Sequence, residues 1–123
     1  MDQTTTPLFV LGATPPDFWW QVRVPVPGDN AYSHATFEAQ FRPVDQTELD
    51  RMQGFGLAEG ELPPTDEQIA RRVLVGWKLQ GPEGPLPFTP ENLQQLLAAP
   101  MVRTAVVATY LACMRGVAAR KNG

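Results

Sequence analysis

The chain has 123 residues, of which 43% are apolar, so it is long enough for one ordinary globular domain, residues 1–123. Its single cysteine, Cys113, excludes an internal disulfide and fits a reducing cytosol. No apolar run approaches 18 residues, so we expect no membrane span, and a net charge of −3 argues against a dedicated nucleic-acid binder.

Residues 1–7 are polar, and we expect a loose segment over residues 1–17, with the apolar run PLFVL within it. Residues 18–43 instead alternate between apolar and polar side chains in two runs around a turn-forming GDN, which predicts an antiparallel β-hairpin. Pro25 has no backbone N–H to give to a ladder, so the first strand is an edge strand or its N–H side faces solvent.

Trp19 and Trp20 are adjacent and therefore point to opposite faces of this strand. One of them belongs to the core, and the sequence leaves open which one. The other is exposed or covered by a further element. Phe18 and Trp19 are accordingly interaction candidates, and the alternative is that they pack locally against the apolar stretch that precedes them.

Residues 44–123 read as helical, with helices expected near residues 46–53, 66–77, 90–98 and 101–119. Capping patterns precede the first three, at Asp45, Thr65 and Thr89. A hairpin followed by about four helices predicts the α+β class rather than a parallel α/β sheet.

Apolar side chains at helical and strand spacing define the expected core. We expect the following to be mostly buried: Trp20, Phe37, Phe41, Ile69, Val73, Trp77, Leu93, Leu97, Val106 and Tyr110. Among them Trp77, Leu93, Leu97 and Tyr110, together with Phe88, are the structural anchors of the helical part.

Charge is unevenly distributed along the chain. Residues 38–67 hold eight acids and two arginines, a net of −6, whereas residues 101–123 hold four basic residues and no acid, a net of +4. Either these are two solvated surfaces, or the molecule has an acidic and a basic end suited to self-association or to an acidic partner. The cationic interaction candidates are Arg103, Arg115, Arg120 and Lys121.

The sequence offers few residues that could form a catalytic or metal site. The chain has one histidine, His34, and one cysteine, far apart in sequence, which is too few ligands for a zinc or haem site. Cys113 falls on the apolar stripe of the last helix, where a cysteine behaves as a small hydrophobic residue. We therefore expect no enzyme activity, no cofactor and no metal.

The segment from residue 73 to the C-terminus resembles the tail assembly chaperones of long-tailed phages and prophages. The matching residues are Gly76, Trp77, the run GPLPFTPENL at 84–93, and Arg120, Lys121 and Asn122. Upstream, FEAQFR at 37–42 and the acidic segment with Glu48 and Leu49 are similar in layout, so the resemblance covers about residues 20–122. The family carries more aspartates in the loop after the tryptophan, where this chain has only Glu83.

The resemblance implies a non-catalytic protein that binds the tape-measure protein and keeps it soluble while the tail tube assembles. It implies action in the cytoplasm of the bacterial host and absence from the mature virion. In many phages a frameshift appends a domain that recruits the tail tube subunit, and we expect a shift site near the codons for Lys121 and Asn122. Prolines 82, 85, 87 and 90 stiffen the linker that this family motif occupies.

The alternative function is a small DNA-binding or regulatory module that uses the basic C-terminal helix. Net acidity and the apolar stripe on the same helix weaken it, and nucleic acid is not the expected partner. Self-association into a homo-oligomer is expected from the uneven charge and from the exposed aromatic candidates.

Overall fold

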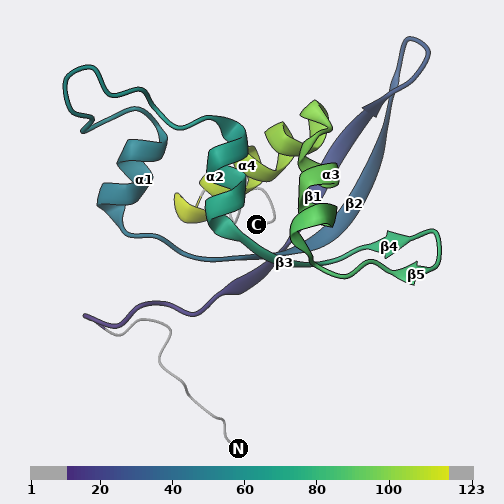
Figure 1. Cartoon of the computed structure of the whole chain (residues 1–123), viewed down its shortest axis with the longest axis horizontal. Coiled ribbons are helices and arrows are strands. Elements are labelled where there is room, and N and C mark those ends of the chain that lie inside the picture. Colours follow the sequence, from purple (N-terminus) through teal and green to yellow (C-terminus); the bar gives the residue numbers. More distant parts are fainter. Residues whose placement is uncertain (1–10, 117–123) are drawn as a thin grey trace, which may run out of the picture.

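The computed structural model describes residues 11–116 and shows a three-stranded antiparallel sheet packed against helices (Figure 1). The strand order is β1-β2-β3, and a two-stranded ribbon, β4-β5, projects from the end of β3. The α+β class, with an N-terminal hairpin followed by helices, is confirmed. The elements in chain order are β1 (Phe18–Pro27), β2 (Tyr32–Phe41), α1 (Gln46–Met52), α2 (Asp66–Val73), β3 (Leu74–Lys78), β4 (Gln80–Gly81), β5 (Gly84–Pro85), α3 (Pro90–Leu97) and α4 (Pro100–Met114).

The predicted hairpin is present, with β1 and β2 paired in register from Phe18–Phe41 to Pro27–Tyr32. The turn closes with a bond of 2.8 Å from the Gly28 N–H to the Ala31 carbonyl, and Asn30 adopts φ +60, which asparagine tolerates. Because β1 pairs only with β2 within this sheet, it is an edge strand, one of the two arrangements that its proline predicted.

The predicted helix over residues 66–77 is wrong for its last four residues, 74–77. Helix α2 ends at Val73, and β3 follows at once along the open edge of β2. The Arg42 N–H donates to the Val73 carbonyl at 2.8 Å, which begins the new pairing where the helix stops. Trp77 therefore stands on a strand and not at the end of a helix.

Gly76 fits this strand for a steric reason. It lies opposite Gln40, and a Cβ at Gly76 would sit 2.7 Å from the Gln40 side-chain oxygen. Glycine normally weakens a strand interior, but here it allows a neighbouring side chain to cross close to the backbone.

The capping residues act as predicted. Asp45 accepts the Glu48 N–H, Thr65 and Gln68 form a reciprocal capping box, and Thr89 accepts the Asn92 N–H. Helix α4 is shorter than the predicted 101–119, because it ends at Met114 and Gly116 then turns the chain with φ +75. Residues 117–119 lie outside the described residues.

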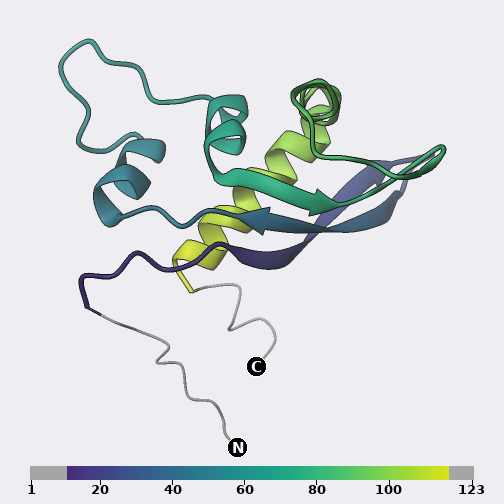
Figure 2. The same cartoon turned by 60° about the horizontal axis from the view of Figure 1, so that its bottom comes forward.

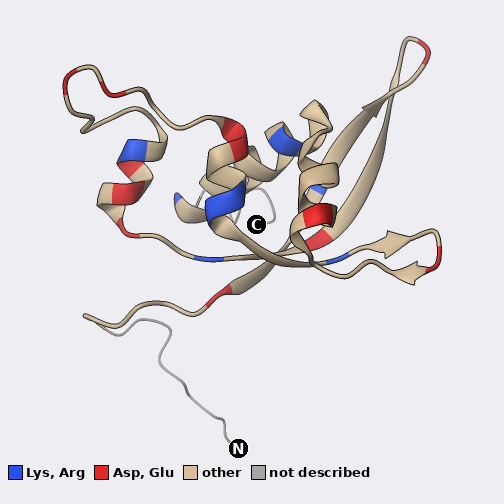
Figure 3. Cartoon of the chain, viewed as in Figure 1, with Lys and Arg blue, Asp and Glu red and all other residues tan. Residues whose placement is uncertain are grey.

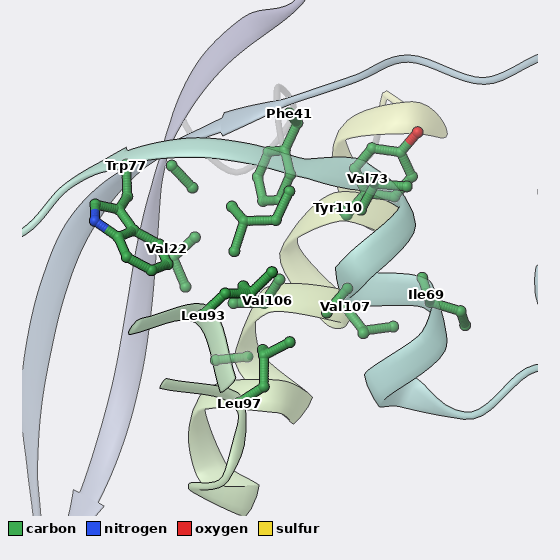
Figure 4. Close-up of a cluster of buried hydrophobic side chains, with 14 of the residues drawn as sticks. Val22, Phe41, Ile69, Val73, Trp77, Leu93, Leu97, Val106, Val107 and Tyr110 are labelled. Carbon is green, nitrogen blue, oxygen red and sulfur yellow. The ribbon is translucent and has the colours of Figure 1, made fainter. Parts of the chain in front are cut away.

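The core lies between the sheet and helices α2, α3 and α4 (Figures 2 and 4). Phe41 and Tyr110 are fully buried at its centre, with ring centroids 5.3 Å apart. Nine of the ten residues expected in the core are buried. Trp20 is the exception: it is only half-buried near the start of β1, whereas Val22 and Val24 further along the same strand are buried.

Candidate functional site

Within the segment that carries the family resemblance, residues 79–88 form an arm that contains β4 and β5. This arm packs on Trp77. The Trp77 indole N–H donates to the Leu86 carbonyl at 2.9 Å, and the Leu86 N–H donates to the Leu79 carbonyl at 2.8 Å. Phe88 lies edge-on to Trp77 with ring centroids 4.6 Å apart. Trp77 is buried as expected of an anchor, whereas Phe88 keeps 38% of its surface exposed.

The base of the arm is fixed to the start of α3. The Asn92 side-chain amide donates to the Pro87 carbonyl at 2.9 Å, while the Asn92 N–H donates to the Thr89 hydroxyl at 3.1 Å. Leu93 and Leu97, the two anchors on α3, are buried against the core. Hydrogen bonds and ring packing therefore connect Trp77, the arm and the start of α3, and Leu93 and Leu97 attach α3 to the core.

The two aromatic interaction candidates face different ways. Trp19 is 42% exposed, and the Lys78 ammonium lies 4.7 Å from the centre of its ring. Phe18 is half-buried and packs on Phe41 with ring centroids 5.8 Å apart. Trp19 is thus the exposed tryptophan of the adjacent pair, and Phe18 belongs to the margin of the core.

The basic candidates do not form a separate basic end within residues 11–116. Arg103 lies 3.7 Å from Glu67 at the start of α2, and the Arg115 guanidinium donates to the Gln53 side-chain carbonyl. Arg72 pairs with Glu48 across α2 and α1 at 2.6 Å. Acidic and basic residues are therefore intermixed along the helices (Figure 3), because folding brings the acidic segment beside the basic helix. Arg120 and Lys121 lie outside the described residues, as does the expected frameshift position.

Reactive groups are few in the described part of the chain. Within residues 11–116, no three His, Cys, Asp or Glu side chains come together as a metal site would require. Burial raises the pKa of the Cys113 thiol to about 11, so the thiol stays protonated at neutral pH and is a weak nucleophile. A hollow of about 250 Å³ between α1, α2 and the loop after α1 contains charged groups, but they pair with one another, as Arg72 does with Glu48 and Arg51 with Glu61.

A larger groove, of about 590 Å³, separates β1 from residues 100–109 of α4. The wall from the hairpin is made by Arg23, Pro25, Pro27 and Tyr32, and the wall from the helix by Pro100, Met101, Thr104, Ala105, Ala108 and Thr109. Sequence reasoning missed this groove because its two walls are separated by about 70 positions in the chain. The only local signal was the pair of prolines at alternate positions of β1.

Among the described residues, no single helix is long and apolar enough to cross a membrane; α3 and α4 reach that length and composition only as a pair, and the chain bends by 99° between them. No family model, curated protein or solved structure matches this chain, so its function is inferred from its own residues and their arrangement.

Proposed function

We propose that this chain is a tail assembly chaperone of a long-tailed phage or prophage. In this role it binds the tape-measure protein without catalysis, keeps that long helical chain soluble while the tail tube assembles, and leaves before the virion is complete. It acts in the cytoplasm of the bacterial host.

The observation that carries this proposal is the coherence of the family-like segment. Five of the residues that resemble the family contact one another in the arm and at the start of α3: Trp77 with Leu86 and Phe88, and Asn92 with Pro87. Trp77 donates to the Leu86 carbonyl and Asn92 holds the base of the arm, while Gly76, just before the arm, admits the Gln40 side chain of the neighbouring strand β2. A set of residues that builds one unit is better evidence of relationship than the same residues scattered over the surface.

The character of the surface adds support. Trp19, Phe55 and Leu62 are large apolar side chains that stay exposed, which suits a protein that covers apolar segments of another chain. The shortage of acids in the arm remains a departure from the family, since Glu83 is its only carboxylate.

The DNA-binding alternative is disfavoured by the placement of its two described arginines. Arg103 is beside Glu67 and Arg115 is bonded to Gln53, so neither stands in a basic patch that would follow a phosphate backbone. A salt-dependent mobility shift with duplex DNA would reverse this preference.

Gene context and solubility test the proposal together. A tail tube gene on one side and a gene for a very long helical protein on the other are expected. That long protein, expressed alone, should be found in the insoluble fraction, and co-expression with this chain should bring it into the soluble fraction as a complex. If the long protein stays insoluble and does not co-purify with the chain, or if the neighbouring genes encode no tail proteins, the proposal is wrong.

A further inference from the structure

The backbone of β1 has two edges, and the hydrogen bonds of the hairpin show which residues face each. The Gly28–Ala31 pair is bonded, and bonded and non-bonded pairs alternate along an antiparallel ladder. Even-numbered residues of β1 therefore bond to β2, and odd-numbered ones direct their N–H and C=O groups away from it. The bond from Arg42 to Val73 gives an independent check, because it places even-numbered residues of β2 toward β3 and leaves the odd-numbered ones for β1.

Both prolines of β1, Pro25 and Pro27, occupy odd positions. Their missing N–H groups cost the hairpin nothing, and the carbonyls at 23, 25 and 27 remain directed to the free edge. Among residues 11–116, no backbone group takes these carbonyls as partners. The Arg23 N–H is the one backbone donor of β1 along the groove, since the other two β1 residues that line it are prolines.

The groove beside this edge, of about 590 Å³, has a composition that suits one added strand. Its helical wall is made of small side chains such as Thr104 and Ala108, with the adaptable Met101 at one end. Arg23 is the only charged residue that lines it, and none of its lining residues is a carboxylate. The groove therefore offers backbone acceptors, apolar space and one positive charge.

We propose that the groove between β1 and α4 binds an extended peptide segment of another protein by strand addition. Its N–H groups donate to the outward carbonyls of β1. Alternate apolar side chains of the segment fill the space over Met101 and Ala108, and a carboxylate on its opposite face pairs with Arg23. This inference follows from the strand geometry and does not depend on the proposed function.

The probe is a blocked hexapeptide in which three valines alternate with glutamate, threonine and glutamate. In an NMR titration we expect the Arg23 amide signal to move downfield and its hydrogen exchange to slow at least several-fold. A matched peptide with lysine in place of both glutamates should bind several-fold more weakly, because it repels Arg23.

Two variants with one control locate the binding. Ala108→Phe fills the groove from an exposed position and should abolish the shift, whereas Gln95→Phe places the same side chain on an exposed position of α3 and should leave it unchanged. Arg23→Gln should bring the glutamate and lysine peptides to equal affinity, and it tests the site independently if Ala108→Phe fails to fold.

Three results would overturn the inference. One is equal binding of the two peptides to the wild-type chain, and another is wild-type binding by Ala108→Phe. The third is slowed exchange of the Arg23 amide that rises with protein concentration without peptide, since the occupant would then be a second copy of this chain.

Discussion

Two edge-to-face aromatic pairs in this molecule are built alike. Phe41 meets Tyr110 at 5.3 Å and 61°, and Trp77 meets Phe88 at 4.6 Å and 68°. In each pair the ring with a polar atom donates a hydrogen bond to a backbone carbonyl. The Tyr110 hydroxyl donates to Arg42 at 2.7 Å, and the Trp77 indole N–H donates to Leu86 at 2.9 Å.

The pairs differ in burial and in the length of chain that they close. Phe41 and Tyr110 are both fully buried, and the Tyr110 hydrogen bond joins positions 68 residues apart. The bond from Trp77 spans nine residues, and its ring partner Phe88 is partly exposed. The same chemistry therefore holds the last helix to the sheet in one place and holds a local arm in the other. The first pair should govern global unfolding, and the second should govern largely the arm.

The largest effect is expected from Tyr110→Ala. It removes a fully buried ring and the partner of the Arg42 carbonyl, so the free energy of unfolding should fall by about 5 kcal/mol, near the top of the range for large core truncations. Urea unfolding followed by tryptophan fluorescence measures this change. A loss below about 1 kcal/mol, the size of a surface effect, would show that α4 does not depend on this pair.

Trp77→Ala should cost about 3 kcal/mol, because the ring is buried but part of what it holds is the arm. Trp19→Ala is the matched control, since it removes a tryptophan from the exposed face of the same sheet. Trp19→Ala should lower the free energy of unfolding by less than about 1 kcal/mol. Equal losses for the two variants would contradict the distinction between a core tryptophan and a surface tryptophan.

Phe88→Ala should have a smaller and more local effect. With the side chain only partly buried, a loss of about 1–2 kcal/mol is expected. Hydrogen exchange should quicken at the Leu86 amide, which bonds to Leu79, and stay unchanged at amides of α4. Phe55→Ala, at a side chain that is more exposed, serves as the control and should change neither. Faster exchange throughout α4 in Phe88→Ala would mean that the arm and the core unfold together.

Alkaline pH separates the two pairs by chemistry, because only Tyr110 carries an ionisable hydroxyl. Burial raises the pKa of Tyr110 to about 12, above its ordinary value of 10.0. The folded state thus holds this proton more tightly than the unfolded state, so the associated stability is complete below pH 10 and is lost between pH 10 and about 12.

Tyr110→Phe should remove this part of the alkaline decline and cost about 1 kcal/mol at neutral pH through the lost hydrogen bond. Denaturant titrations at stepped pH values measure both effects. Both proteins should carry Cys113→Ala in these measurements. The pKa of the Cys113 thiol is raised to about 11, so the thiol would otherwise add its own loss of stability from pH 9 upward. The same pH profile above pH 10 with and without the Tyr110 hydroxyl would contradict the assignment.

Local patterns in the sequence determined the hairpin and the starts of the first three helices. Alternation in the two runs on either side of the GDN turn requires one buried face, and a proline at an outward-facing position of β1 marks the edge strand. Thr65 with Gln68 and Thr89 with Pro90 form caps within four residues of themselves, so no distant partner is needed to predict them. Trp77 was also correctly assigned to the core.

Only the tertiary structure decided the conformation of the chain after Val73. Ile69, Val73 and Trp77 are spaced as on one helix face, and nothing local forbids a helix up to Trp77. The open edge of β2 competes for the same residues, and its hydrogen bonds to the chain from Val73 onward outweigh one more turn of helix. The partner strand lies more than 30 positions upstream, so the local sequence does not reveal it.

The same physical reason applies to the surfaces. The acidic and basic segments are separate in sequence but meet where Arg103 reaches Glu67, and the groove beside β1 exists only because α4 packs next to that strand. A side chain's type and spacing fix its local geometry, whereas its neighbours depend on which distant segment packs against it. The caps and the alternating strands could therefore be predicted from the sequence, and the third strand, the interleaved charges and the groove could not.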